Sequence, residues 1–155
     1  MSNEPSVILE QQQDFRFLVR FGDDKPTLMA DESPPLGAGN GPNPAQLLTA
    51  AVANCMVDSL LFALRKFKQS PEPMRAEGRA DIGRNDQGHL RVQAIHITLR
   101  LGVAAQTLQH LDRALDQFEN FCTVGQSVAQ GIPVLITVTD SAGLILKAPV
   151  IVPSI

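Results

Sequence analysis

Two cysteines, Cys55 and Cys122, are the residues of this sequence best suited to chemistry, and the chain has no others. Two cysteines are too few for the disulfide framework of a small exported protein. A thiolate can attack an O–O bond and become a sulfenic acid, which a second thiol can convert into a disulfide. The pair therefore predicts thiol redox chemistry on peroxides, if the two Cα atoms approach within about 7 Å.

Each cysteine taken alone has a simpler interpretation, because free cysteine often behaves as a small buried hydrophobe. Cys55 lies in the mostly apolar segment 47–64. Cys122 ends a stripe of apolar residues spaced three or four apart, which is typical of the buried face of a helix: Leu108, Leu111, Leu115, Phe118 and Cys122. Two inert core thiols are the alternative to a redox pair.

A thiolate in an apolar wall needs a cation nearby, because burial otherwise raises the pKa of a thiol. Arg16 and Arg20 alternate with apolar residues in segment 15–21, the pattern of a half-buried strand, and therefore share one face of it. Either arginine could support the thiolate. The alternative is a solvated strand face.

Composition argues against several other classes of protein. The net charge is −3 and the basic residues are scattered, which gives no footprint for nucleic acid. His89, His96 and His110 have no metal-ligand spacing, so no metal site is expected. Polar residues, Asp58 among them, interrupt segment 47–64, which indicates a core helix rather than a membrane span. The first fifteen residues lack the features of a secretory signal, so a cytoplasmic protein is expected.

The order of expected elements predicts a single α+β domain over 1–155. Asn43 and Pro44 are suited to the cap and first turn of a long central helix. A bulge is expected near Ala94, where the apolar phase of a strand changes. The expected parts are N-terminal strands (6–11, 15–21, 26–30) and a Pro/Gly loop within 1–42, the central helix 43–68, a β-hairpin 74–102, a second helix with a short helix 105–130, and a C-terminal strand and tail 131–155.

Two segments of the chain resemble the OsmC/Ohr family of organic hydroperoxide reductases. The run GPNPAQLLTAAVANC at 41–55 is similar to the Pro-led helix of that family, which ends in a cysteine. The runs FCTV at 121–124 and GIPV at 131–134 are similar to its second cysteine segment and the strand that follows. The order of elements agrees from about residue 7 to residue 140.

The resemblance implies two long central helices packed between antiparallel sheets in an intertwined homodimer, with active sites at the subunit interface. It implies that Cys55 is the peroxidatic thiol and Cys122 the resolving thiol. Arg16 is the nearest match to the supporting arginine of the family, and Arg20 is a second candidate. The resemblance also implies an organic hydroperoxide as substrate, an external dithiol such as a lipoylated protein as reductant, and no cofactor.

Two positions depart from the family pattern. Ala45 stands where the peroxidases carry a glutamate that orients the arginine, and Glu32 or Asp31 could replace that glutamate. Cys122 is followed by Thr123 instead of proline. The leading hypothesis is an OsmC-like thiol peroxidase that contributes to oxidative stress defence. The alternative is a non-enzymatic redox sensor or a protein that binds a small apolar ligand.

Overall fold

The computed structural model describes residues 4–149 and confirms the α+β class. The chain divides into two compact units, with the division between Leu48 and Thr49. Each unit is described separately.

The first unit is a three-stranded antiparallel sheet in the order β1-β2-β3, followed by the Pro/Gly loop. Its strands are β1 (Ile8–Gln13), β2 (Arg16–Arg20) and β3 (Leu28–Ala30). Only Val19 and Ala30 are buried among the apolar residues described in this unit, and every residue of β1 is exposed. The alternation expected on β2 holds only at its end, where Val19 is buried and Arg20 exposed. Arg16, Phe17 and Leu18 are all half-buried, and the flanking Phe15 and Phe21 are exposed.

The long central helix is confirmed as α1 (Pro44–Lys66). It begins with a reciprocal cap: the Gln46 amide donates to Asn43 Oδ1 (2.9 Å), and the Asn43 amide donates to Gln46 Oε1 (2.9 Å). Arg65 and Lys66 occupy its last turn, where cations are favourable. By length and composition, α1 is long and apolar enough to cross a membrane. This is weak evidence for a membrane span, because the core helix of a globular protein can be equally long and apolar.

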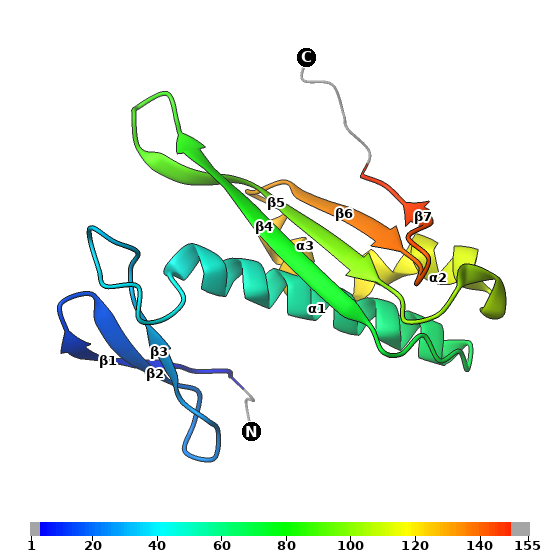
Figure 1. Cartoon of the computed structure of the whole chain (residues 1–155), viewed down its shortest axis with the longest axis horizontal. Helices are drawn as coiled ribbons and strands as arrows, with labels where there is room; N and C mark the ends of the chain where they lie inside the picture. Colours follow the sequence, from blue (N-terminus) through cyan, green and yellow to red (C-terminus); the bar gives the residue numbers. More distant parts are fainter. Residues whose placement is uncertain (1–3, 150–155) are drawn as a thin grey trace. The chain divides into compact units, whose positions relative to one another are not determined.

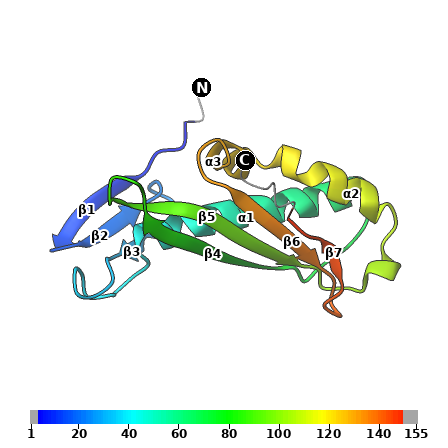
Figure 2. The same ribbon diagram turned by 90° about the horizontal axis from the view of Figure 1, so that it is seen from above.

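The second unit contains a four-stranded sheet in the order β4-β5-β6-β7. Its strands are β4 (Arg75–Arg84), β5 (Leu90–Arg100), β6 (Val134–Thr139) and β7 (Ile145–Lys147). The expected bulge is confirmed, because Asp81 pairs with Ala94 whereas Ile82 pairs with Val92. The prediction of purely antiparallel sheets is wrong: β5 and β6 are parallel, since the connection between them crosses over through helices. Figures 1 and 2 show these helices on one face of the sheet.

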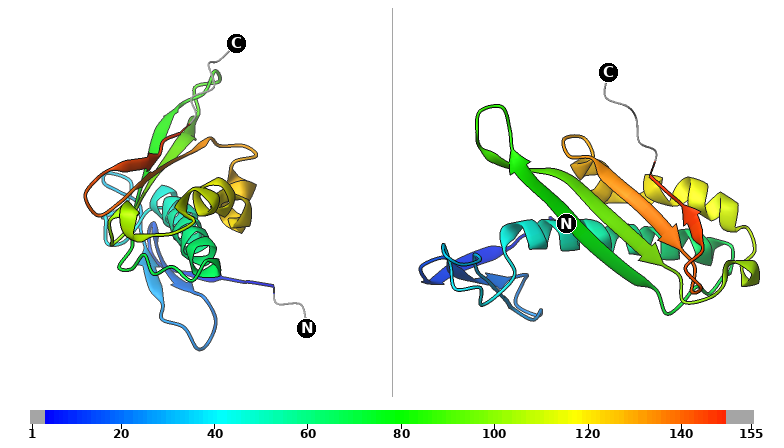
Figure 3. Two further views of the ribbon diagram at one scale, coloured as in Figure 1. Left: turned by 90° about the vertical axis from the view of Figure 1, so that its right-hand side faces the viewer. Right: turned by 45° about the horizontal axis from the view of Figure 1, so that its top comes forward.

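The second long helix is also a wrong prediction, because segment 105–128 forms four short helical pieces (Figure 3). They are η1 (Ala105–Thr107), α2 (Leu111–Gln117), η2 (Phe118–Phe121) and α3 (Thr123–Val128). His110 has a left-handed backbone (φ 56°), which an α-helix cannot continue through, and η2 tightens to 3-10 geometry. The apolar stripe survives the breaks, with Leu115, Phe118 and Cys122 buried.

Candidate active site

An open pocket of about 430 Å³ lies in the second unit, with Cys55 in its wall. Four of its lining residues come from α1 at positions i, i+3, i+4 and i+7, which places them on one face of the helix: Cys55, Asp58, Ser59 and Phe62. Phe121 from η2 completes the lining. The wall is mostly apolar, so the pocket suits an apolar molecule that presents a reactive group to the Cys55 thiol.

Cys122 interacts with Cys55 and Ser59 of this pocket and is fully buried, whereas Cys55 is half-buried. Both are free thiols. The Gly125 amide donates a hydrogen bond to Cys122 Sγ (3.2 Å). A Cβ at Gly125 would lie 2.7 Å from Cys122 Sγ and 2.8 Å from Met56 Cε, so only glycine fits without displacing a buried neighbour.

The two thiols interact, and the interaction shows in the acidity of the buried one. The pKa of Cys122 rises from 9.0 to about 11, first because burial disfavours the thiolate and second because the Cys55 side chain shares a hydrogen bond with it. The Gly125 amide and the Ser59 hydroxyl act in the opposite direction and are outweighed. Cys122 therefore stays a protonated thiol at neutral pH, next to Cys55.

Two aromatic rings form the outer wall of the pocket. Phe62 and Phe121 contact each other edge to face, with ring centroids 5.4 Å apart. Lys66 places its ammonium 5.6 Å from the Phe62 centroid and 5.1 Å from the Phe121 centroid. Asp58, which is exposed, accepts a hydrogen bond from Asn54 Nδ2 (3.1 Å). Charges of both signs thus stand at the pocket.

Ser59 is a site residue that sequence reasoning missed. Its hydroxyl donates to the Cys55 carbonyl oxygen (2.8 Å) and also interacts with Cys122, although the residue is only 5% exposed. Its position four residues after Cys55 was the available signal, because residues at that spacing share a helix face.

In the first unit, Arg16 lines a polar cavity of about 450 Å³ together with Asp31 and the backbone of the Pro/Gly loop. Within the part of the chain that the structure describes, Arg16 Nε is buried and lacks a hydrogen-bond partner, while its Nη2 donates to Gln13 Oε1 (3.1 Å). A buried donor of this kind is rare, and it marks a place where an acceptor oxygen would be stabilised.

Asp31 is a buried carboxylate, 3% exposed, that accepts three backbone amides: Glu32 (2.8 Å), Ala38 (3.3 Å) and Asn40 (3.0 Å). The hydrogen bond from Asn40 does most to lower its pKa, against the effect of burial, and the charge of Arg16 lowers it further. Of the two acidic residues expected to face the arginine, Asp31 lines the cavity of Arg16. Glu32 contributes its backbone, with its carbonyl accepting from the Gly39 amide (3.0 Å).

Arg20 lies on the same strand as Arg16 in a different environment. Its Nε donates to Glu10 Oε2 (2.7 Å), and both side chains are about half exposed, at 48% and 53%. This is a surface ion pair between β1 and β2. Such pairs contribute little to stability, and Arg20 has an anionic partner already.

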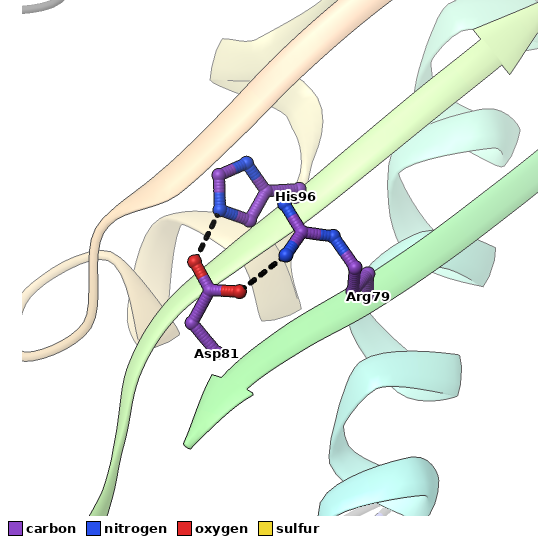
Figure 4. A network of polar contacts seen from close by, with 3 residues as sticks. All are labelled: Arg79, Asp81 and His96. Atoms are coloured by element: carbon purple, nitrogen blue, oxygen red, sulfur yellow. Dashed lines mark hydrogen bonds and ion pairs between the residues drawn. The ribbon is translucent and has the colours of Figure 1, made fainter. Parts of the chain in front are cut away.

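A separate polar cluster crosses β4 and β5 (Figure 4). Asp81 accepts from Arg79 Nη1 (2.5 Å) through one oxygen, and its other oxygen lies 2.7 Å from His96 Nε2. The hydrogen bond with His96 is the main cause of the lowered pKa of Asp81. These side chains point away from α1, because a Cβ on the alternate residue Gly78 would contact Thr49 of that helix. The cluster ties the two strands together and is outside the thiol site.

Metal binding requires several ligands in one place. Across residues 4–149, no three His, Cys, Asp or Glu side chains come together in a way that could hold a metal ion.

Comparison with known proteins decides the family. A family model described as OsmC-like protein matches residues 37–137, which is more than half of the chain and includes both cysteines. The chain belongs to the OsmC-like family. Among curated protein sequences, none matches this OsmC-like protein significantly.

Several solved structures share the fold of this OsmC-like chain. One from Psychrobacter arcticus, described as an osmotic stress induced and detoxification response protein, has a TM-score of 0.73 at 19% identity and covers 89% of this chain and 98% of its own. An OsmC-like protein from Vibrio cholerae gives 0.68 at 22% identity, with 88% and 97% covered. The organic hydroperoxide resistance protein OhrB of Bacillus subtilis gives 0.66 at 14% identity, with 87% and 97% covered. At these identities the likeness establishes the fold.

Proposed function

We propose that this OsmC-like protein is a thiol-dependent peroxidase that reduces organic hydroperoxides through Cys55 and Cys122 and contributes to oxidative stress defence in the cytoplasm. The observation that carries the proposal is the interaction of the Cys122 thiol with Cys55, which lines an open, mostly apolar pocket. The relatives named for organic hydroperoxide resistance support it. The phenylalanine rings favour an organic substrate over hydrogen peroxide, because they offer apolar contact area.

The proposed reaction uses the two sulfurs in turn. The Cys55 thiolate attacks the terminal oxygen of the hydroperoxide, the O–O bond breaks, and the alkoxide takes a proton to leave as an alcohol. Cys55 becomes a sulfenic acid. The Cys122 sulfur then attacks the Cys55 sulfur, and its proton leaves with the hydroxyl group as water, which forms a disulfide. An external dithiol, such as a lipoylated protein, returns two electrons and two protons and restores both thiols.

The raised pKa of Cys122 is consistent with the order of these roles. A thiol that stays protonated is a poor nucleophile toward a peroxide, so the half-buried Cys55 is the thiol that reacts first. We propose Arg16 as the cation that stabilises the Cys55 thiolate, since its buried Nε is a hydrogen-bond donor without an acceptor among the described residues. Asp31 is proposed as its acidic partner in place of Glu32, and Arg20 as a less direct candidate because Glu10 already neutralises it.

A homodimer is part of the proposal. The described part of the first unit buries only Val19 and Ala30 among its apolar residues, whereas Ile8, Leu9 and Phe15 are exposed. A small sheet with so little buried apolar surface is not stable by itself in water. A second copy of the chain is the partner expected to cover it, and light scattering of the purified protein tests this.

A steady-state assay with cumene hydroperoxide and dihydrolipoamide tests the activity. Cys55→Ser is expected to reduce turnover to the uncatalysed background. Cys122→Ser is the matched control: without the dithiol, it should still consume about one equivalent of peroxide to give a sulfenic acid at Cys55, with no intramolecular disulfide. Turnover that survives Cys55→Ser would reject the proposal.

The apolar character of the pocket also favours a second function, the binding of a small apolar ligand or slow oxidant sensing without turnover. The rate of sulfenic acid formation at Cys55 discriminates between the two. A peroxidase reacts orders of magnitude faster than free cysteine under a small excess of peroxide, whereas a binding protein or slow sensor without thiolate activation reacts no faster.

A further inference from the structure

Lys147 of β7 makes three contacts with the segment that leads to Cys122. Its ammonium donates to the Leu115 carbonyl (2.9 Å), lies 2.6 Å from Glu119 Oε2, and sits 5.2 Å from the centroid of the Phe118 ring. Carbonyls in the last turn of a helix lack partners within the helix, and a cation there is favourable. Lys147 thus donates a hydrogen bond to a carbonyl in the last turn of α2 and also anchors η2 through Glu119 and Phe118.

These contacts are better shielded from solvent than the other lysine or arginine ion pairs of the described chain. The side chains of Lys147 and Glu119 are 28% and 33% exposed, whereas Arg20 and Glu10 are about half exposed. Phe118, beneath the ammonium, is fully buried. A partly shielded cation with a carboxylate, a carbonyl and an aromatic face is held more firmly than a surface pair.

The clamp reaches the resolving thiol through the backbone. The Cys122 amide donates to the Glu119 carbonyl oxygen (3.1 Å). Glu119 therefore links the two residues: its side chain pairs with Lys147, and its backbone carbonyl binds the Cys122 amide. On the other side the Gly125 amide fixes Cys122 Sγ. Cys122 is therefore held at its sulfur by α3 and at its backbone amide by the residue that Lys147 pairs with.

We propose that Lys147, through Glu119, is a positioning residue that keeps the Cys122 sulfur within bonding range of Cys55. This inference rests on the proposed redox pair. A thiol that is held in place forms its disulfide more readily, because less conformational freedom is lost on closure. Releasing the clamp removes no contact of Cys55, which lies on α1, and lowers the fraction of time in which the second sulfur is in reach.

The test is the thiol–disulfide equilibrium of the purified protein with dithiothreitol. Oxidised dithiothreitol takes two electrons and two protons from Cys55 and Cys122, which become a disulfide, and is itself reduced. Lys147→Met keeps the length of the side chain and removes its charge, and it is expected to lower the equilibrium constant for the protein disulfide by about fivefold. Lys147→Arg should recover most of the loss.

Lys68→Met is the matched control, because Lys68 is exposed and the charge change is the same, and it should leave the equilibrium unchanged. Glu119→Gln should repeat the effect of Lys147→Met, and the double variant should add nothing further. Glu119→Gln also carries the test if Lys147→Met does not fold. A lowered melting temperature with an unchanged equilibrium would overturn the inference, as would failure of the wild type to form the disulfide.

No peroxide enters this measurement. A shifted equilibrium in a protein that does not reduce cumene hydroperoxide would leave the positioning role standing and reject the peroxidase.

Discussion

Cys122 in the second unit and Asp31 in the first are almost equally inaccessible, at 0% and 3% exposure, yet their acidities move in opposite directions. Burial raises the pKa of the Cys122 thiol to about 11. Asp31 feels the same effect, but three backbone amides outweigh it and lower its pKa. Cys122 receives one amide, from Gly125.

The difference teaches that burial alone does not set the charge of a group in this protein. Hydrogen bonds act together with burial: three backbone amides favour the Asp31 carboxylate, whereas the bond shared with Cys55 disfavours the Cys122 thiolate and one amide opposes it. The Pro/Gly loop wraps amides around Asp31 and keeps an anion ionised there. The turn around Cys122 offers one amide and keeps a neutral thiol. Asp140 behaves like Asp31. It is 2% exposed, it accepts hydrogen bonds from the backbone amides of Ala105, Ala142 and Leu144, and its pKa is lowered.

The titration of Cys122 gives the largest expected effect. An ordinary thiol with a pKa of 9.0 is half ionised at pH 9.0, whereas Cys122 with a pKa of about 11 is ionised to about a hundredth, roughly a fiftyfold difference. NMR titration of the reduced protein with labelled cysteine measures this. A midpoint at or below pH 9.0 would contradict the comparison.

The same shift has a consequence for stability. The native state holds the Cys122 proton more tightly than the unfolded chain, so its contribution is complete below pH 9.0 and is lost as the pH rises toward about 11. Reduced wild type should therefore lose stability over this interval more steeply than Cys122→Ala.

Gly125→Ala is expected to have the next largest effect, a loss of stability, and it tests how tightly the turn packs around Cys122. The added Cβ would lie 2.7 Å from Cys122 Sγ, and such overpacking lowers the free energy of unfolding by about 1–3 kcal/mol. Gly131→Ala is the control, because no atom lies within 4 Å of its added Cβ, and it should change stability by less than about 0.5 kcal/mol. Urea unfolding measures both. Equal stability of the two variants would contradict this, because it would show that the turn around Cys122 can shift to accommodate the added Cβ.

Arg16→Met is expected to give the smallest effect, a slight rise in the pKa of Asp31, and it tests the Asp31 side of the comparison. The charge of Arg16 is the smallest of the causes that lower the pKa of Asp31, so its removal should raise this pKa only slightly and leave it below 3.8. NMR titration of the Asp31 carboxyl follows the change. If the pKa of Asp31 returned to 3.8, the arginine rather than the loop amides would control the carboxylate.

Much of the fold could be predicted from local patterns. The reciprocal cap at Asn43, the long helix α1, the hairpin of β4 and β5 and its bulge all follow from residue types at short spacing. The second helix could not be predicted correctly from periodicity. Its apolar stripe has the spacing of one continuous helix, but the left-handed backbone at His110 and the 3-10 turn at 118–121 break it, while Leu115, Phe118 and Cys122 stay buried.

The candidate site was predictable in part. Cys55 and Cys122 could be chosen by residue type, and the family resemblance assigned their roles. Ser59 was missed as a site residue, and the choice between Asp31 and Glu32 was left open. Lys147 carried no signal, because a single lysine near the end of a chain has no pattern that connects it to a distant turn.

The sequence by itself determined which side chains share a face of α1, because helical spacing places residues three, four and seven apart together whatever surrounds them. It also determined that a thiol, a guanidinium and a carboxylate were present. Only the tertiary structure decided that Cys122 packs against Cys55, that one amide reaches the buried thiol whereas three reach Asp31, and that Lys147 holds the turn before Cys122. These are contacts between residues remote in sequence or set by loop backbone, and both depend on how the chain packs rather than on local propensity.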